Sequence, residues 1–118
     1  GIMYGSSTGV FNGKVFVRPD AQRTNAFQQN TNIVADRGAS INTKPELEIY
    51  ADDVKCAHGC TVGQFDLDAL FYLKSRGIQE KAAKALLVEA FLADVISSVP
   101  STELRKEIMK IYQERHGW

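Results

Sequence analysis

The spacing of apolar residues changes near Gly63, and this change limits what the chain can fold into. Before Gly63, short apolar runs alternate every second residue, as in 15–17 and 47–49, and Gly, Asn and Asp separate them. Such alternation predicts β-strands joined by turns. After Gly63, apolar residues recur at helical spacing. We therefore predict mainly β structure over residues 1–63 and a helical domain over residues 64–118, with the two classes segregated along the chain.

The alternating half does not reveal its own architecture. The predicted strands are short and closely spaced, and no exact repeat period is visible, so a sandwich, a barrel and a β-solenoid all remain open. Pro19 and Pro45 are expected at strand boundaries, where a missing N–H donor does least harm to a sheet. Asp52 and Asp53 form a turn signal between two alternating runs.

Three helices are expected after Gly63. The first should begin at Asp66 as N-cap and end near Arg76, before Gly77. The second should begin near 79–80 and end before Ser97, and the third should start after Pro100 with Ser101 or Thr102 as its cap. The residues expected to be buried are Leu67, Leu70, Phe71 and Leu73 in the first helix, Ala83, Leu86, Leu87, Val88, Ala90, Phe91, Leu92 and Val95 in the second, and Leu104, Ile108, Ile111 and Tyr112 in the third.

Charge and hydropathy exclude several classes of partner. The chain has 14 basic and 14 acidic residues and a net charge of zero, whereas nucleic-acid binding needs clustered basic excess. A membrane-surface role lacks the same signal, and no apolar run reaches the ~18–20 residues of a spanning helix. The chain starts with Gly1 in what reads as mid-strand sequence, so we expect a piece of a longer protein. With only two cysteines, reduced thiols in a cytoplasmic protein are expected.

Metal-competent groups cluster only at Cys56-Ala57-His58-Gly59-Cys60. If this stretch is extended, its three metal-competent residues share one face, with alternate Cα atoms ~6.5 Å apart. A thiolate and an imidazole suit zinc, copper or iron–sulfur chemistry. That spacing does not converge on one ion, and four ligands are not available, so we expect no metal held stably by this chain alone.

Three functional readings of this cluster remain open, two of them from residue chemistry alone. Cys56 and Cys60 can be small buried apolar residues in a generic α+β protein-interaction module, which is the commonest state of a free cysteine. A small zinc or thiol-dependent enzyme is a second reading, although no third orienting group accompanies Cys56 and His58. The third, an assembly scaffold whose partner completes the ligand set, is implied only by the family resemblance of the surrounding sequence.

A longer stretch of sequence favours the scaffold. Residues 42–59 (NTKPELEIYADDVKCAHG) resemble the signature of the SufB/SufD family of iron–sulfur cluster assembly proteins. The resemblance continues through 61–64, 69–73 and 75–78, and upstream through FNGKV at 11–15 and QRTNA at 22–26. The form Lys55-Cys56-x-His58-Gly59 is similar to the SufD branch.

The resemblance implies a fold and a set of partners. Residues 1–63 would be the end of a right-handed parallel β-helix, and residues 64–118 the C-terminal three-helix domain. The chain would belong to a non-enzymatic scaffold that pairs with a SufB-like subunit and docks a SufC-like ATPase. An iron–sulfur cluster would be held transiently in the full complex, and no cofactor would be held by the isolated chain.

The resemblance also implies site residues. His58, with Cys56, would lie at the interface with the SufB-like subunit, and Cys60 would be an additional thiol where many relatives have Ala. The ATPase would dock on the helical domain, with Leu70, Phe71, Tyr72 and Arg76 as candidate contacts. Because the end of a β-helix exposes unpaired strand edges, we expect the isolated chain to form a homodimer through them.

Overall fold

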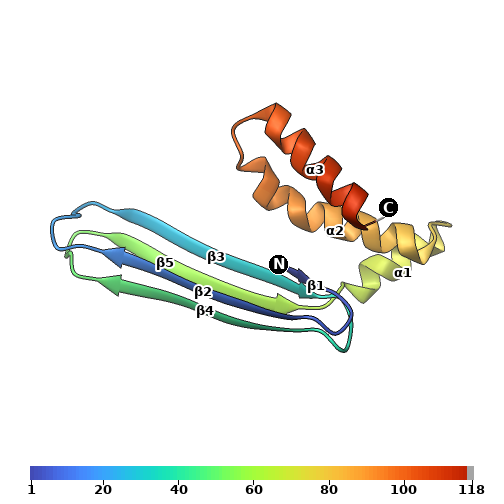
Figure 1. The fold of residues 1–118 in the computed structure, drawn as a ribbon, viewed down its shortest axis with the longest axis horizontal. Helices are drawn as coiled ribbons and strands as arrows, with labels where there is room; N and C mark the ends of the chain where they lie inside the picture. Colours follow the sequence, from blue (N-terminus) through green and yellow to red (C-terminus); the bar gives the residue numbers. More distant parts are fainter. Residues whose placement is uncertain (117–118) are drawn as a thin grey trace. The chain divides into compact units, whose positions relative to one another are not determined.

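The computed structural model describes residues 1–116. The chain divides into two compact units, Gly1–Gln64 and Phe65–Trp118, which Figure 1 draws as a set of long strands and a group of helices. Parallel β-strands make up the first unit and three helices the second, as the change of apolar period predicts.

The strand unit is built from parallel pairs in two separate sheets. Its strands are β1 (Ile2–Met3), β2 (Thr8–Val17), β3 (Asn25–Val34), β4 (Ser40–Ile49) and β5 (Lys55–Gly63). One sheet has the order β1-β3-β5 and the other pairs β2 with β4, so successive strands alternate between the two sheets (Figure 1). Thr8 lies opposite Ser40, which is 32 positions further along the chain. Ile2 lies opposite Ile33 and Asn25 opposite Lys55, so the chain returns to the same sheet after 30 to 32 residues.

The facing sides of the two sheets form a narrow interior. Val17 is only 2% exposed, and Thr43 of β4 contacts Cys60 of β5 through its hydroxyl group. Polar side chains enter this interior as well: Asn32 is also 2% exposed, and its Nδ2 donates to Asn30 Oδ1 at 2.6 Å and to the Thr61 carbonyl at 3.2 Å. The interior of the strand unit is therefore partly polar, and it is held by side-chain hydrogen bonds as well as by apolar contact.

Pro45 does not mark a strand boundary, and that prediction is wrong. It lies within β4, opposite Gly13 of β2. Within residues 1–116, β4 pairs only with β2 and is therefore an edge strand. An edge strand tolerates proline because the missing N–H can face away from the sheet.

The helices begin and end largely where the sequence predicts. They are α1 (Leu67–Ser75), α2 (Glu80–Ser97) and α3 (Thr102–His116). Asp66 Oδ1 accepts hydrogen bonds from the backbone N–H groups of Asp68 and Ala69 at 2.9 and 3.0 Å, which caps α1. Gly77 follows α1 with a φ of 86°, and Ser101 Oγ accepts from the Leu104 N–H at 3.2 Å to open α3. Helix α2 extends one residue further than expected, to Ser97.

The predicted buried faces of the helices are too wide. Leu70, Ala83 and Val88 are buried, but Leu67 and Phe71 of α1 are 72% and 74% exposed. The other residues predicted buried that are exposed are Leu86, Ala90 and Val95 of α2 and Leu104 and Ile111 of α3. In this unit α1 contacts α2 and α2 contacts α3, so each contact covers only a narrow strip of an apolar helix face. None of the helices described in residues 1–116 has the length and apolar character to cross a membrane.

An ion-pair triad joins the end of α1 to the start of α2, and it predicts an acid-sensitive contribution to stability. Glu80 accepts from Lys74 at 2.8 Å and pairs with Lys84 at 2.9 Å. The hydrogen bonds from Lys74 and then Lys84 lower the pKa of Glu80 from 4.5 to about 2. A lowered carboxylate pKa stabilises the folded state above the unfolded pKa and loses that effect as the pH falls toward the folded pKa. We expect the melting temperature of the helical unit to fall between about pH 4.5 and 2 partly through Glu80.

This contribution can be isolated by substitution. Circular dichroism melts of Glu80→Gln should depend less on pH in that window than melts of the parent chain. Glu89→Gln, at another exposed glutamate of α2, is the control and should keep the parental dependence. Equal pH dependence in the parent and in Glu80→Gln would contradict the role of the triad.

Candidate functional site

The three metal-competent residues lie on alternate positions of β5. Cys56 is half-buried, His58 and Cys60 are exposed, and both cysteines are free thiols. Because β5 is extended over Lys55–Gly63, Cys56, His58 and Cys60 share one face of the strand. The contact between Cys60 and Thr43 of β4 identifies this face as the one toward the other sheet.

The neighbouring strand adds polar groups to the same face. The β3–β5 register places Ala26 opposite Cys56, Gln28 opposite His58 and Asn30 opposite Cys60. On its other side β5 has no strand partner within residues 1–116, and β4 is likewise unpaired there. Of the outer strands, β4 and β5 contact one another. His58 and Cys60 therefore lie at an open end of the paired sheets.

This arrangement offers an incomplete ligand set. Among the described residues, no three His, Cys, Asp or Glu side chains are grouped so that they could hold a metal ion. Alternate residues of one strand are ~6.5 Å apart, which is too far for neighbouring ligands to converge without help. Cys56 and His58 can supply one or two soft or imidazole ligands to a site that another chain completes.

The candidate docking residues of α1 separate into two groups. Phe71 is 74% exposed, Tyr72 is 57% exposed, and the Arg76 guanidinium lies 5.2 Å from the centre of the Tyr72 ring. Leu70 is only 9% exposed. Its side chain therefore packs mainly within the helical unit, whereas Phe71, Tyr72 and Arg76 are exposed.

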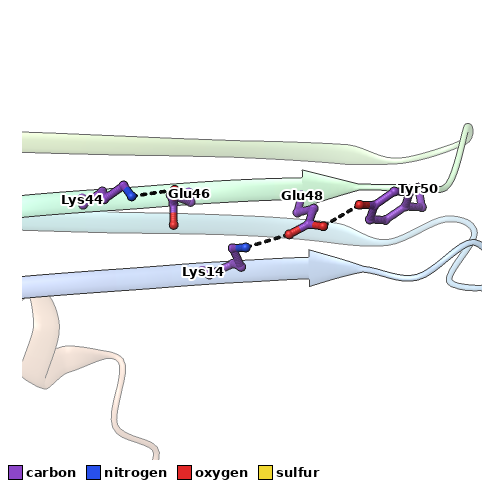
Figure 2. Close-up of polar contacts among 5 residues, drawn as sticks. All are labelled: Lys14, Lys44, Glu46, Glu48 and Tyr50. Carbon is purple, nitrogen blue, oxygen red and sulfur yellow. Dashed lines mark hydrogen bonds and ion pairs between the residues drawn. The ribbon is translucent and has the colours of Figure 1, made fainter.

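A charged ladder on β2 and β4 was not singled out in the sequence. Figure 2 shows Lys14 Nζ donating to Glu48 Oε2 at 2.7 Å, while the Tyr50 hydroxyl donates to the other oxygen of Glu48. Lys44 pairs with Glu46 along the same strand at 3.1 Å. The hydrogen bond from Lys14 holds the pKa of Glu48 below its ordinary value. In the sequence, only the alternation of Lys44, Glu46 and Glu48 indicates this charged ladder. Their even positions place them on the opposite side of β4 from Thr43.

Gln28 is the residue of the site that sequence reasoning missed. Its Oε1 is buried and has no hydrogen-bond partner among residues 1–116. A glutamine in an alternating strand reads as a solvent-facing residue, and only the pairing of β3 with β5 places it opposite His58.

Several of the known proteins that this chain resembles are iron–sulfur cluster assembly proteins. Residues 1–91 match the SufBD core domain of SUF system FeS cluster assembly. The chain is 49% identical over 96 residues to an iron–sulfur cluster assembly SufBD family protein of Synechocystis, covering 81% of this chain and 21% of that protein. It is 41% identical over 100 residues to the iron–sulfur cluster assembly protein SufD of Escherichia coli, covering 85% and 24%. It is 31% identical over 115 residues to SufD of Bacillus subtilis, covering 98% and 26%.

These matches extend over most of the chain, which spans about a quarter of the length of the SufD relatives. They include both the strand unit and the start of the helical unit, since the family match runs to residue 91. The chain belongs to the SufBD family of iron–sulfur cluster assembly proteins, and within that family it is similar to SufD.

Proposed function

We propose that this chain is the cluster-assembly end of a SufD-like, non-enzymatic scaffold subunit. The observation that carries the proposal is the placement of Cys56 and the exposed His58 on an edge strand with too few ligands of their own. A scaffold that assembles clusters between two subunits needs such a half-site on each. The family match supplies the chemistry of the cargo, an iron–sulfur cluster.

The strand pairing supports a β-helix as the architecture of this scaffold. Strands alternate between two parallel sheets, and each returns beside its predecessor after one circuit. We assign residues 1–63 to the end of a right-handed parallel β-helix and residues 64–118 to a C-terminal helical domain. Residues 117 and 118 of that domain lie outside the described residues.

A SufB-like subunit is the proposed partner of the strand unit. The free edges of β4 and β5 offer backbone donors and acceptors to an incoming strand. In the complex, His58 and Cys56 would face ligands of that subunit, and Cys60 would add a further thiol. Without the partner, the same edges would pair two copies of the chain as a homodimer.

A SufC-like ATPase is the proposed partner of the helical unit, within a cytoplasmic complex. Phe71 and Tyr72 expose aromatic surface on α1, and Arg76 stacks beside Tyr72. Aromatic residues and arginine are enriched in the energetically dominant parts of interfaces.

The test is cluster assembly in the reconstituted complex of the full-length subunits. His58→Ala should lower the yield of assembled cluster by about tenfold or more, in the range seen when a supporting residue of a metal site is removed. Iron and sulfide content and the visible absorption of the cluster measure the yield. Co-purification of the three subunits is checked first, so that a loss of assembly is separated from a loss of binding.

Thr61→Ala is the matched control. Thr61 is exposed on the same strand at an odd position, so its side chain lies on the opposite face of β5. It should retain parental cluster yield. If His58→Ala also retains that yield in an intact complex, the assignment of His58 fails and a generic interaction module becomes the better description.

A further inference from the structure

Gln28 carries an unexplained buried acceptor beside the proposed assembly site. Its Oε1 is buried and accepts no hydrogen bond within the described part of the chain. Buried polar atoms without a partner are rare in folded proteins, and each one calls for a specific reason. Asn30, two residues along β3, offers a contrast because its Oδ1 accepts from Asn32 at 2.6 Å.

A glycine on another strand leaves the space that the Gln28 amide occupies. A Cβ placed on Gly13 of β2 would overlap Gln28 Nε2, and it would lie 2.7 Å from the Phe11 ring. The absence of a side chain at Gly13 therefore makes the space in which the amide lies. The half-buried Gln28 therefore directs its amide toward Gly13 of the other sheet.

His58 is the ladder neighbour of Gln28. The two residues lie directly opposite one another in the β3–β5 register, and adjacent strands are about 4.8 Å apart. Gln28 contacts the position of Gly13 on β2, and Cys60, which shares a face with His58, contacts Thr43 on β4. Both side chains therefore belong to the facing sides of the sheets, within reach of one another.

We propose that a ring N–H of His58 donates to Gln28 Oε1 once the exposed His58 side chain turns toward the interior, a bond that the structure itself does not contain, and that Gln28 so acts as a positioning residue for His58. A neutral imidazole has one donor and one acceptor nitrogen. When one nitrogen donates to Gln28, the other keeps its lone pair and points away from the interior, toward the open end of the sheets. In metal sites, the hydrogen bond made by the ring nitrogen that does not bind the metal fixes the tautomer and orientation of the histidine in the same way. The inference rests on the proposed role of His58.

The tautomer of His58 provides a test that does not depend on cluster assembly. The chain has two histidines, so ring nitrogen spectra of the ¹⁵N-histidine-labelled full chain should show two sets of signals. His58→Ala identifies the His58 set, and His116 serves as the internal reference. Spectra are recorded in buffer alkaline enough to keep both imidazoles neutral.

Gln28→Leu should change the ratio of the two His58 tautomers by roughly fivefold, the effect of losing one ordinary net hydrogen bond. Gln28→Glu, which keeps an oxygen acceptor at the same place, should retain the parental tautomer preference. Gln29→Leu is the matched control, because Gln29 is exposed at the adjacent position on the other face of β3, and it should leave the His58 signals unchanged. Thermal melts confirm that each variant is folded.

An unchanged His58 tautomer ratio in folded Gln28→Leu would overturn the inference. In the reconstituted complex, Gln28→Leu should also lower the cluster yield, and Gln28→Glu should restore part of it. If the tautomer ratio responds to Gln28 while His58→Ala retains full yield, the positioning contact stands and the proposed function fails. If His58→Ala lowers the cluster yield while Gln28→Leu leaves the His58 tautomer ratio unchanged, the function stands and the positioning role fails.

Discussion

Val88→Asp is expected to unfold the helical unit. Val88 lies in α2 and is 0% exposed, like Ala83 on the same helix. The substitution removes about 1.5–2 kcal/mol of apolar burial and places an unpaired carboxylate in the core, so the total cost is about 4 kcal/mol or more. A unit of this size has a total stability of only about 3–8 kcal/mol. Loss of the helical circular dichroism signal at room temperature is the expected measurement.

Val95→Asp is the matched control for Val88→Asp. Val95 belongs to the same helix but is 66% exposed, so aspartate there remains solvated and should change stability by about 0.5 kcal/mol or less. Native-like helical signal in Val88→Asp, or equal destabilisation by the two substitutions, would show that Val88 is not a core residue.

Gly13→Val is expected to destabilise the strand unit by about 1–2 kcal/mol, the lower part of the range for overpacking, because the Gln28 amide is the tip of a flexible side chain and can move aside. The first carbon of the new side chain would overlap Gln28 Nε2 and lie 2.7 Å from the Phe11 ring. Overpacking an interior typically costs about 1–3 kcal/mol, which exceeds the gain from placing a β-branched residue in a strand. Chemical denaturation followed by the strand circular dichroism signal should show a lower midpoint with an unchanged slope.

Gly63→Val separates this overlap from the general effect of valine in a strand. Gly63 is the last residue of β5, and a Cβ there has no neighbour within 4 Å in the described part of the chain, so the variant should be as stable as the parent or slightly more stable. Combining Gly13→Val with Gln28→Ala removes one of the overlapping side chains and should recover part of the loss. Additive effects in this double-mutant cycle would contradict the contact between position 13 and Gln28.

The helix ends were readable from the sequence because their causes are local. Asp66 and Ser101 each accept a hydrogen bond from a backbone N–H within three residues, and Gly77 adopts a positive φ just after α1. Burial was not readable in the same way. Leu67 and Phe71 follow helical spacing, yet both are exposed. The periodicity predicts which face of a helix is apolar, but it does not predict how many neighbouring elements cover that face.

The strand pairing was hidden for a different reason. Thr8 and Ser40 pair and are chemically alike, but Phe11 pairs with Thr43, a residue of different character. The backbone returns after 30 to 32 residues without repeating the same side chains, so no exact period is visible in the sequence. The shared face of Cys56 and His58 follows from strand geometry alone, whereas the place of Gln28 depends on pairing between distant segments.

Pro45 has a consequence for aggregation and for partner choice. Free strand edges template the addition of foreign strands, and proteins blunt them with proline because it interrupts the row of backbone donors. The free edge of β4 carries this interruption in its middle, whereas β5 has no proline from Lys55 to Gly63. Uncontrolled lateral growth is therefore discouraged along β4. Of these two edges, an incoming strand meets an unbroken row of donors on β5, the strand that carries Cys56 and His58.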